Sequence, residues 1–431
     1  MMSSRQVPGI GLDDALKLTY RSGYIKLDPG RYRRKTTPAA GEEKLMGIGI
    51  ATRRYWLGLG CLAASFIGAL PGTVQAQVPS VNGQCVLSTL LQGDTQAAGT
   101  LQSTCGQTWS GHGGTAVVAR LQDGSVLVAG GDTPGQFGAI ASTKAEAYLP
   151  QEGIFLPVGA MQAASYLPQF TLLGNGQVLV IDDFGTSEVY TPALLGFQKV
   201  GSPLKDHGPS EGSLTAFGQT NALLAGGWIG DTTLADAEVY HASTRSYTLT
   251  GSLNQGRFYH SAVQLADGRV LIVGGFTNGT TFGDPAARAE IYNPATGKFT
   301  LAARMITPRG NAYAVVLRDG RVLVAGGSIT DFSQDLTSAE IYDPVSDTFR
   351  STGSMVRTVP PFQFGIQPFV LPNGKVLIGD EIYDPASGSF SLAPGQPPLG
   401  GPMVMLLTGQ VLQPGPYTAG PGQAYLYQPP R

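Results

Sequence analysis

Short apolar runs recur along the chain, and each follows a turn signal. In one copy, residues 261–266 form the first predicted strand, Asp267-Gly268 marks a turn, and the apolar run that follows ends at Gly274-Gly275. Asp-Gly favours a tight hairpin because Gly accepts a positive φ. A short, continuously apolar run bounded by such turns is typical of a β-strand that is covered on both faces. The pattern therefore predicts an all-β fold.

The same unit occurs seven times. The apolar run and the turn before it are found at residues 121–131, 173–183, 217–227, 265–275, 317–327, 371–381 and 406–416. A block similar to Glu-x-Tyr follows each run, with its tyrosine at Tyr148, Tyr190, Tyr240, Tyr292, Tyr342, Tyr383 and Tyr427. The gaps between successive tyrosines are 42, 50, 52, 50, 41 and 44 residues. This period predicts propeller blades of four strands, here called A to D in chain order, rather than a short solenoid repeat.

A double Gly after the apolar run, then a Tyr and a second aromatic at a fixed distance, resembles the kelch motif. The second aromatic is at Phe155, Phe197, Tyr247, Phe299, Phe349 and Phe390. The resemblance covers about residues 106–431 and implies a seven-bladed kelch-type β-propeller, similar to the propeller domain of galactose oxidase. Asp182-Asp183 and Gly379-Asp380 replace the double Gly, so blades two and six are expected to be distorted there.

The seventh copy ends at Arg431 without a strand D, so its fourth strand is expected from elsewhere in the chain. In the intact copies strand D precedes the next turn by a nearly constant distance. Counting back from Asp123 leads to about residues 101–105. We expect this N-terminal strand to complete the last blade and close the propeller.

Residues 46–76 have the organisation of a secretory signal peptide. Arg53-Arg54 precedes an apolar run, and Val74-Gln75-Ala76 supplies small residues at the two positions that a signal peptidase reads. We expect cleavage before Gln77 and export to the periplasm or the extracellular space. The arginine pair fits a twin-arginine signal and an ordinary signal equally. An uncleaved anchor is the alternative, although the run is short and glycine-rich for a membrane span.

Three regions are therefore expected. A signal normally begins at the amino terminus, so translation is expected to start at Met46, with residues 1–45 either outside the true protein or forming a disordered extension; a start at Met1 is the alternative. Residues 46–76 form the signal peptide and residues 77–431 the propeller. The mature chain is expected to be a monomer that does not insert into membranes.

Composition and charge exclude several classes of protein and of binding partner. Charged residues are 13% of the chain and hydrophobic residues 42%, with 60 Gly and 30 Pro, which argues against both a helical protein and a disordered one. From Gln77 onward there are 17 basic and 25 acidic residues, a net charge of −8. Such a surface repels phosphate backbones, so no nucleic-acid partner is expected.

Only two cysteines remain after the expected cleavage, Cys85 and Cys105. An even pair in an oxidising compartment predicts a disulfide, which would hold the closing strand in place. Two free thiols are the alternative.

The B–C loops are long, whereas the A–B turns have two residues. Because strands alternate in direction, the B–C and D–A loops share one rim of the propeller, which we call the long-loop rim, and binding residues concentrate on such loops. We expect this rim to contact a protein or a glycan, although the loops could also be tolerated insertions. The candidate binding residues are the aromatic, arginine and other polar side chains Trp228, Arg257, His260, Phe276, Arg288, Arg309, Asn311, Tyr313 and Phe332.

The alternative function is a carbohydrate-active enzyme, either an oxidoreductase of the galactose oxidase type or a sugar isomerase, with its site at the mouth of the channel. Galactose oxidase holds copper with two Tyr and two His, one Tyr being cross-linked to a Cys. Tyr259-His260 is similar to part of that set, but both remaining cysteines precede the first full repeat. We therefore expect no cofactor and no catalytic residue.

Two further sets of residues could bind a metal or take part in catalysis. His112, His207 and His260 are expected near one mouth of the channel, so a three-histidine metal site is conceivable, but His260 also occupies the Arg-x-x-His position that packs in kelch repeats. We expect no metal site. The glutamates of strand C recur in equivalent places in six blades, which indicates structural hydrogen bonding rather than catalysis. They are Glu146, Glu188, Glu238, Glu290, Glu340 and Glu381.

Overall fold

The computed structural model describes residues 99–104, 112, 115–135, 138–208, 211–277, 284–330, 333–358, 366–395, 401–414 and 424–430. The chain divides into two units, Met1–Ala76 and Gln77–Arg431, and every described residue belongs to the second. Within the described residues, no helix is long and apolar enough to cross a membrane. A short 3-10 turn, η2, lies at Pro192–Leu194.

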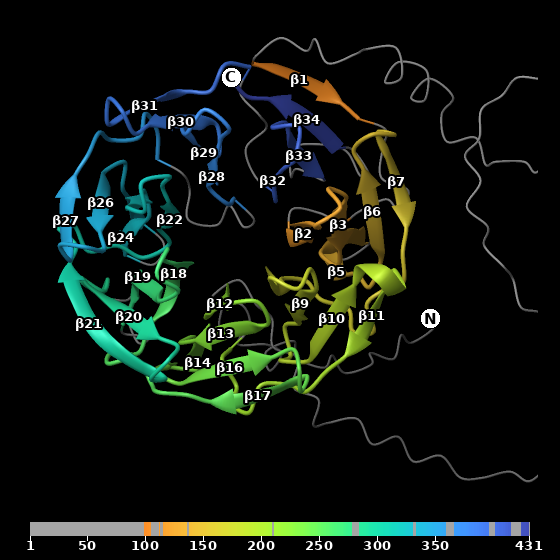
Figure 1. The fold of residues 1–431 in the computed structure, drawn as a ribbon, viewed down its shortest axis with the longest axis horizontal. Helices are drawn as coiled ribbons and strands as arrows, with labels where there is room; N and C mark the ends of the chain where they lie inside the picture. The colour runs from red at the N-terminus through yellow and green to blue at the C-terminus, as the bar shows by residue number, and fades with distance from the viewer. Residues whose placement is uncertain are drawn as a thin grey trace, which may run out of the picture. The chain divides into compact units, whose positions relative to one another are not determined.

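Seven four-stranded antiparallel sheets follow one another around a central channel, as the sequence predicts (Figure 1). Blade 1 contains β2 (Val117–Arg120), β3 (Val126–Ala129), β6 (Ala145–Leu149) and β7 (Ile154–Pro157). Blade 2 contains β8 (Gln169–Leu172), β9 (Val178–Ile181), β10 (Ser187–Thr191) and β11 (Gly196–Lys199). Blade 3 contains β12 (Ser213–Phe217), β13 (Asn221–Ala225), β16 (Ala237–His241) and β17 (Ser246–Leu249).

The remaining blades repeat this order of strands, with strand A innermost and strand D outermost. Blade 4 contains β18 (Phe258–Gln264), β19 (Val270–Phe276), β20 (Arg288–Asn293) and β21 (Lys298–Arg304). Blade 5 contains β22 (Tyr313–Val316), β23 (Val322–Ala325), β26 (Ala339–Asp343) and β27 (Thr348–Ser351). Blade 6 contains β28 (Phe369–Val370), β29 (Val376–Ile378), β30 (Glu381–Asp384) and β31 (Ser389–Leu392). Blade 7 contains β32 (Val404–Met405), β33 (Val411–Pro414), β34 (Ala424–Gln428) and β1 (Thr100–Ser103).

The hydrophobic core lies between adjacent blades. Leu271 and Val273 of blade 4, for example, belong to one buried cluster with Val322 and Val324 of blade 5. The continuous apolar runs of strand B are buried along their length because each sheet is covered by a neighbour on both faces. The repeated tyrosine of strand C packs on the aromatic of strand D, as in the pair of Tyr148 and Phe155, whose ring centroids are 4.8 Å apart.

The predicted closure is confirmed. Strand β1 pairs antiparallel with β34 and forms the outermost strand of the last blade. The amide of Gly99 donates to the carbonyl of Gln428 at 2.7 Å, which extends the ladder at one end. Cys85 and Cys105 lie outside the described residues, so the expected disulfide stays a prediction.

Blades two and six keep regular sheets. They differ from the blades with a double Gly in the B–C connection. In blade 2 β9 ends at Ile181 and β10 begins at Ser187, and in blade 6 only two residues separate β29 from β30. The Asp183 carboxylate accepts hydrogen bonds from the Tyr166 and Leu167 amides of the incoming D–A loop. The expected distortion is therefore confined to the loop, which is short where the double Gly is missing.

The double Gly is needed in blades 1 and 3, because the backbone of the D–A loop passes against it. Gly227 has a φ of +120°, and a Cβ there would lie 1.9 Å from the His207 carbonyl oxygen. Gly131 has a φ of +78°, and a Cβ there would lie 2.0 Å from the His112 carbonyl oxygen. No side chain fits at such a distance, so these two positions require glycine.

Candidate functional site

The B–C loops of blades 1, 3 and 5 form two-stranded hairpins on the long-loop rim. These are β4 (Asp132–Gly135) with β5 (Gly138–Ala141), β14 (Trp228–Ile229) with β15 (Thr232–Thr233), and β24 (Ser328–Thr330) with β25 (Ser333–Asp335). In blade 4 a single bridge joins Phe276 and Pro285 at the base of the loop. The long loops are therefore organised structures rather than unstructured insertions.

A buried glutamate of strand C fixes the D–A loop that leads into its own blade. Glu340 accepts hydrogen bonds from the amides of Ile306 and Thr307 at 2.8 and 2.9 Å, and Glu381 accepts from those of Val356 and Arg357. The same arrangement recurs at Glu188, Glu238 and Glu290. These carboxylates hold the loops in place, as the sequence predicts.

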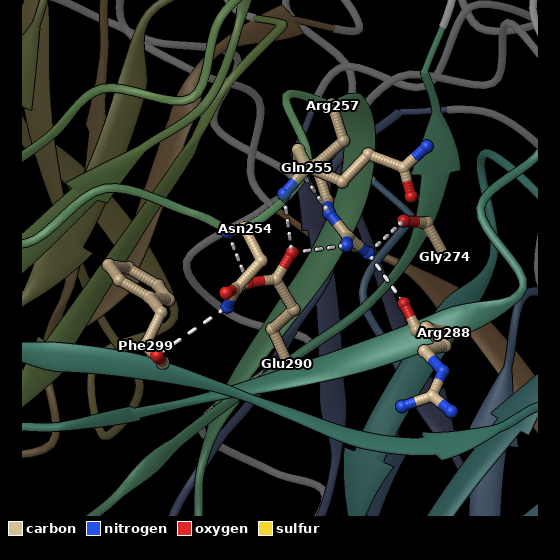
Figure 2. A network of polar contacts seen from close by, with 7 residues as sticks. All are labelled: Asn254, Gln255, Arg257, Gly274, Arg288, Glu290 and Phe299. Atoms are coloured by element: carbon tan, nitrogen blue, oxygen red, sulfur yellow. Dashed lines mark hydrogen bonds and ion pairs between the residues drawn. The ribbon is translucent and has the colours of Figure 1, made fainter.

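In blade 4 an arginine completes this contact (Figure 2). Arg257 Nη2 donates to Glu290 Oε1 at 2.6 Å, while Nη1 donates to the carbonyls of Gly274 and Arg288 at 3.1 and 3.0 Å. Both charged side chains are fully buried. Burial lowers the pKa of the Arg257 guanidinium, and the Glu290 carboxylate opposes that shift. Arg257 therefore links the D–A loop, the double Gly and strand C.

Blade 5 has the same arrangement. Arg309 Nη2 donates to Glu340 Oε1 at 2.9 Å, and its Nη1 donates to the Gly326 carbonyl at 2.8 Å. Arg309 is also fully buried. Arg257 and Arg309, both predicted as partner contacts, lie buried inside the scaffold, where each is paired with a buried carboxylate.

Histidines replace these arginines in blades 1 and 3. His207 Nδ1 lies 2.7 Å from the Gly226 carbonyl oxygen and its Nε2 lies 3.4 Å from Glu238 Oε1, and His112 contacts Gly130 and Glu146 in the same way. Although burial alone raises the pKa of Glu238, the hydrogen bonds from His207 and two backbone amides leave it below its usual value.

This role of the histidines could have been found from spacing. His112 and His207 precede the first Gly of the double Gly by 18 and 19 residues, and the two arginines precede theirs by 17. Within the part of the chain that the structure describes, no group of three or more His, Cys, Asp or Glu could hold a metal ion.

An aromatic cluster supports the rim at blades 3 and 4. The ring of Trp228 stacks on that of Phe258 with centroids 5.5 Å apart, and Phe258 also contacts Tyr259 and Phe276. Phe258 and Phe276 are buried, whereas Trp228 is half-buried. A Cβ at Gly310 would lie 2.1 Å from the Phe276 ring, so the D–A loop into blade 5 rests directly on this cluster.

Five buried polar atoms of blades 3 to 5 have no hydrogen-bond partner. They are Trp228 Nε1, His260 Nδ1, Asn311 Nδ2, Ser328 Oγ and Asp335 Oδ1. Backbone contacts join several of these residues: the Asn311 amide donates to the Tyr259 carbonyl, and Ser328 pairs with Gly310 and with Asp335. Buried polar groups are nearly always hydrogen-bonded, so this set indicates enclosed water molecules beneath the rim.

Burial shifts two of these groups. It raises the pKa of the Asp335 carboxyl. Burial, together with the charge of Arg257, lowers the pKa of His260 to about 3, and His260 Nε2 lies 2.8 Å from Ser213 Oγ. His260 is therefore a neutral group within the rim at neutral pH.

The other predicted site residues take different places. Phe276 is buried, Trp228, Asn311 and Tyr313 are half-buried, and Arg288 is exposed; Phe332 lies outside the described residues. The sequence analysis missed Ile229 and Ile329, which occupy equivalent positions in β14 and β24 and are each 38% exposed. Their position two residues after the double Gly was the available signal. Apolar side chains on both hairpins add hydrophobic contact area to the rim.

Comparison with known proteins gives partial matches. The Kelch motif family model matches residues 257–306 and 309–356. Kelch-like protein 23 of Pongo abelii is 28% identical over 197 residues, which cover 44% of this chain and 34% of that protein. The tRNA wybutosine-synthesizing protein 4 of Saccharomyces cerevisiae is 27% identical over 169 residues, which cover 37% of this chain and 24% of that protein. The match thus spans about a third or less of the length of these relatives.

Among solved structures, that of YjhT is similar over 55% of this chain and 83% of that chain. The TM-score is 0.45 and the sequence identity 11%.

Proposed function

We propose, from the premise that this chain is a kelch-repeat protein folded as a seven-bladed β-propeller, that it is a binding module for a protein partner. The partner contacts the long-loop rim of blades 3 to 5. The observation that carries the proposal is the exposed apolar surface of two rim hairpins, Ile229 in β14 and Ile329 in β24, each 38% exposed. A partner that covers both side chains gains binding free energy from the apolar area removed from water.

The chemistry of this rim defines the partner further. Ile229 and Ile329 offer apolar contacts, and the half-buried ring of Trp228 is the type of residue that dominates binding at interfaces. Asp206 and Asp231 are exposed on the loops of blade 3. These properties favour a partner segment with aliphatic and basic side chains.

Glycan recognition is the alternative, and Trp228 is the observation that favours it. A half-buried indole offers a flat apolar face, which suits a sugar ring.

The cellular location of the protein is part of the same proposal. We propose that the chain is exported to the periplasm or the extracellular space, is cleaved before Gln77, acts as a monomer and carries a disulfide between Cys85 and Cys105. The motif of residues 46–76 supports this. Peptide mapping of the exported protein without reduction tests it: a mature end upstream of Met46, or two free thiols, contradicts it.

The rim is tested by comparing two substituted proteins with the wild type. Ile229→Asp combined with Ile329→Asp places charge on both hairpins. Val345→Asp is the matched control, because Val345 is 95% exposed on the C–D turn of blade 5, at the opposite rim. Partners are identified by affinity purification from the native host followed by mass spectrometry, and are then made as purified proteins for titration.

The proposal expects at least one purified partner to bind the wild type and Val345→Asp equally, and the double variant about tenfold or more weakly. A glycan array probed with the same three proteins tests the alternative. Equal binding of a partner by all three proteins, or no binding of any protein partner, contradicts the proposal.

A further inference from the structure

A cavity of about 420 Å³ lies in the central channel. The innermost strands of six of the seven blades line it, all except that of blade 5. The walls combine apolar side chains, among them Phe170, Leu214 and Phe369, with the polar side chains of Arg120, Thr171, Thr215 and Gln367. This volume falls within the range of about 300–1,000 Å³ that is typical of sites for small molecules.

Arg120 is the one charged residue in this described lining. It is the last residue of β2, and the equivalent positions of the other six blades carry uncharged side chains. These are Leu172, Ala216, Gln264, Val316, Val370 and Met405. The positive charge therefore occurs at this position in blade 1 only and is not part of the repeat.

The guanidinium of Arg120 is only partly satisfied. Its Nη1 donates to the Met405 carbonyl oxygen at 2.9 Å, which joins blade 1 to blade 7. A guanidinium has five N–H donors and stays charged, so further donors remain. Among the described residues, no carboxylate forms an ion pair with Arg120. A cation without a counter-ion in a partly apolar cavity favours an anion in the same space.

We propose that the central channel binds a small organic carboxylate with an apolar body, and that the carboxylate pairs with Arg120. Arginine binds a carboxylate through two parallel N–H donors, which gives both affinity and orientation. Arg120 stands at the end of strand A next to the A–B turn, so the carboxylate lies toward the short-turn rim. The apolar body extends along the channel toward Phe170 and Leu214. This site is separate from the long-loop rim and does not depend on the function proposed for that rim.

The test uses the full chain and two probes of matched length, octanoate and 1-octanol, titrated by calorimetry. We expect octanoate to bind the wild type at least about tenfold more tightly than 1-octanol, as a charge-assisted hydrogen bond implies. Arg120→Gln should reduce octanoate binding to the level of 1-octanol. Arg350→Gln is the matched control, because Arg350 is exposed on the outermost strand β27, and it should bind as the wild type does.

A second variant keeps the proposal testable if Arg120→Gln does not fold. Thr215 also lines the cavity, and Thr215→Glu supplies an internal carboxylate that competes for the cation. It should weaken octanoate binding about tenfold or more and leave 1-octanol binding unchanged. Equal binding of both probes by the wild type, binding of neither, or an octanoate preference that survives in both Arg120→Gln and Thr215→Glu overturns the proposal.

Discussion

Leu101 and Tyr427 lie opposite each other in adjacent antiparallel strands, although they stand at the two ends of the described chain. This pairing completes the last blade and closes the ring of sheets. It depends on backbone hydrogen bonds, so the identity of the residues in β1 matters less than their ability to form a strand. The first prediction follows from this.

Replacing residues 100–103 with Gly-Pro-Gly-Pro should lower the free energy of unfolding by about 3 kcal/mol or more, because proline has no amide to donate and a backbone hydrogen bond contributes roughly 1 kcal/mol. Urea denaturation monitored by circular dichroism measures it. The control, Thr-Val-Thr-Val at the same positions, should retain most of the stability. Equal stability of both replacements would show that β1 does not close the fold.

The buried ion pair of blade 5 gives a second prediction. Arg309→Met should lower the free energy of unfolding by about 3–5 kcal/mol, because it leaves the Glu340 carboxylate buried without its cation. The exposed Arg350 provides the comparison, and Arg350→Met should change stability by less than about 0.5 kcal/mol. Chemical denaturation of the two variants measures the difference. Similar losses in both would mean that the pair has no special structural role.

Acid should destabilise the protein through His260. Its pKa is about 3 in the folded chain because of burial and the nearby charge of Arg257, and about 6.5 in an unfolded chain. As the pH falls below 6.5, His260 binds a proton in the unfolded chain but stays neutral in the folded chain. The contribution of His260 to the free energy of unfolding is therefore present above pH 6.5 and is lost toward pH 3.

Between pH 7.5 and 5.5 this loss amounts to about 1 kcal/mol. His260→Gln should remove that part of the pH dependence, and His241→Gln, on strand β16, should leave it in place. Denaturation curves at the two pH values provide the measurement. The same decline with pH in the wild type and in His260→Gln would contradict the assignment.

The double Gly supplies the fourth prediction. Gly227→Ala should destabilise the protein by about 3 kcal/mol or more, because its Cβ would collide with the His207 carbonyl group and the backbone there cannot yield easily. Gly230 also has a positive φ, but nothing lies within 4 Å of a Cβ there. Gly230→Ala should therefore cost only about 1 kcal/mol from backbone strain. Equal melting temperatures for the two variants would rule out the steric explanation.

Much of the fold was predictable because the repeat combines several independent signals. Asp-Gly turns, apolar runs and regular tyrosines fix the number of blades, and the spacing before Asp123 located the closing strand. The shortness of the B–C connections in blades two and six was also visible in the tyrosine gaps of 42 and 41 residues. Its link to the missing double Gly required the close backbone contacts that only the structure shows.

The site was harder to predict because the burial of a residue depends on contacts with residues that are distant in the sequence. Arginines usually lie at the surface, and nothing near Arg257 in the sequence shows that Glu290, 33 residues later, meets it inside the blade. The role of His207 needed the same knowledge, since it performs the task of an arginine with a different side chain. Ile229 and Ile329 lie in predicted B–C loops, and their importance became visible only when their exposure was known.

The short B–C connections of blades two and six have a practical consequence. A recognition loop grafted onto blade 2 would replace the segment that carries Asp183, whose carboxylate accepts hydrogen bonds from the Tyr166 and Leu167 amides. The graft must therefore supply another acceptor for these two amides, because otherwise the incoming D–A loop loses its anchor.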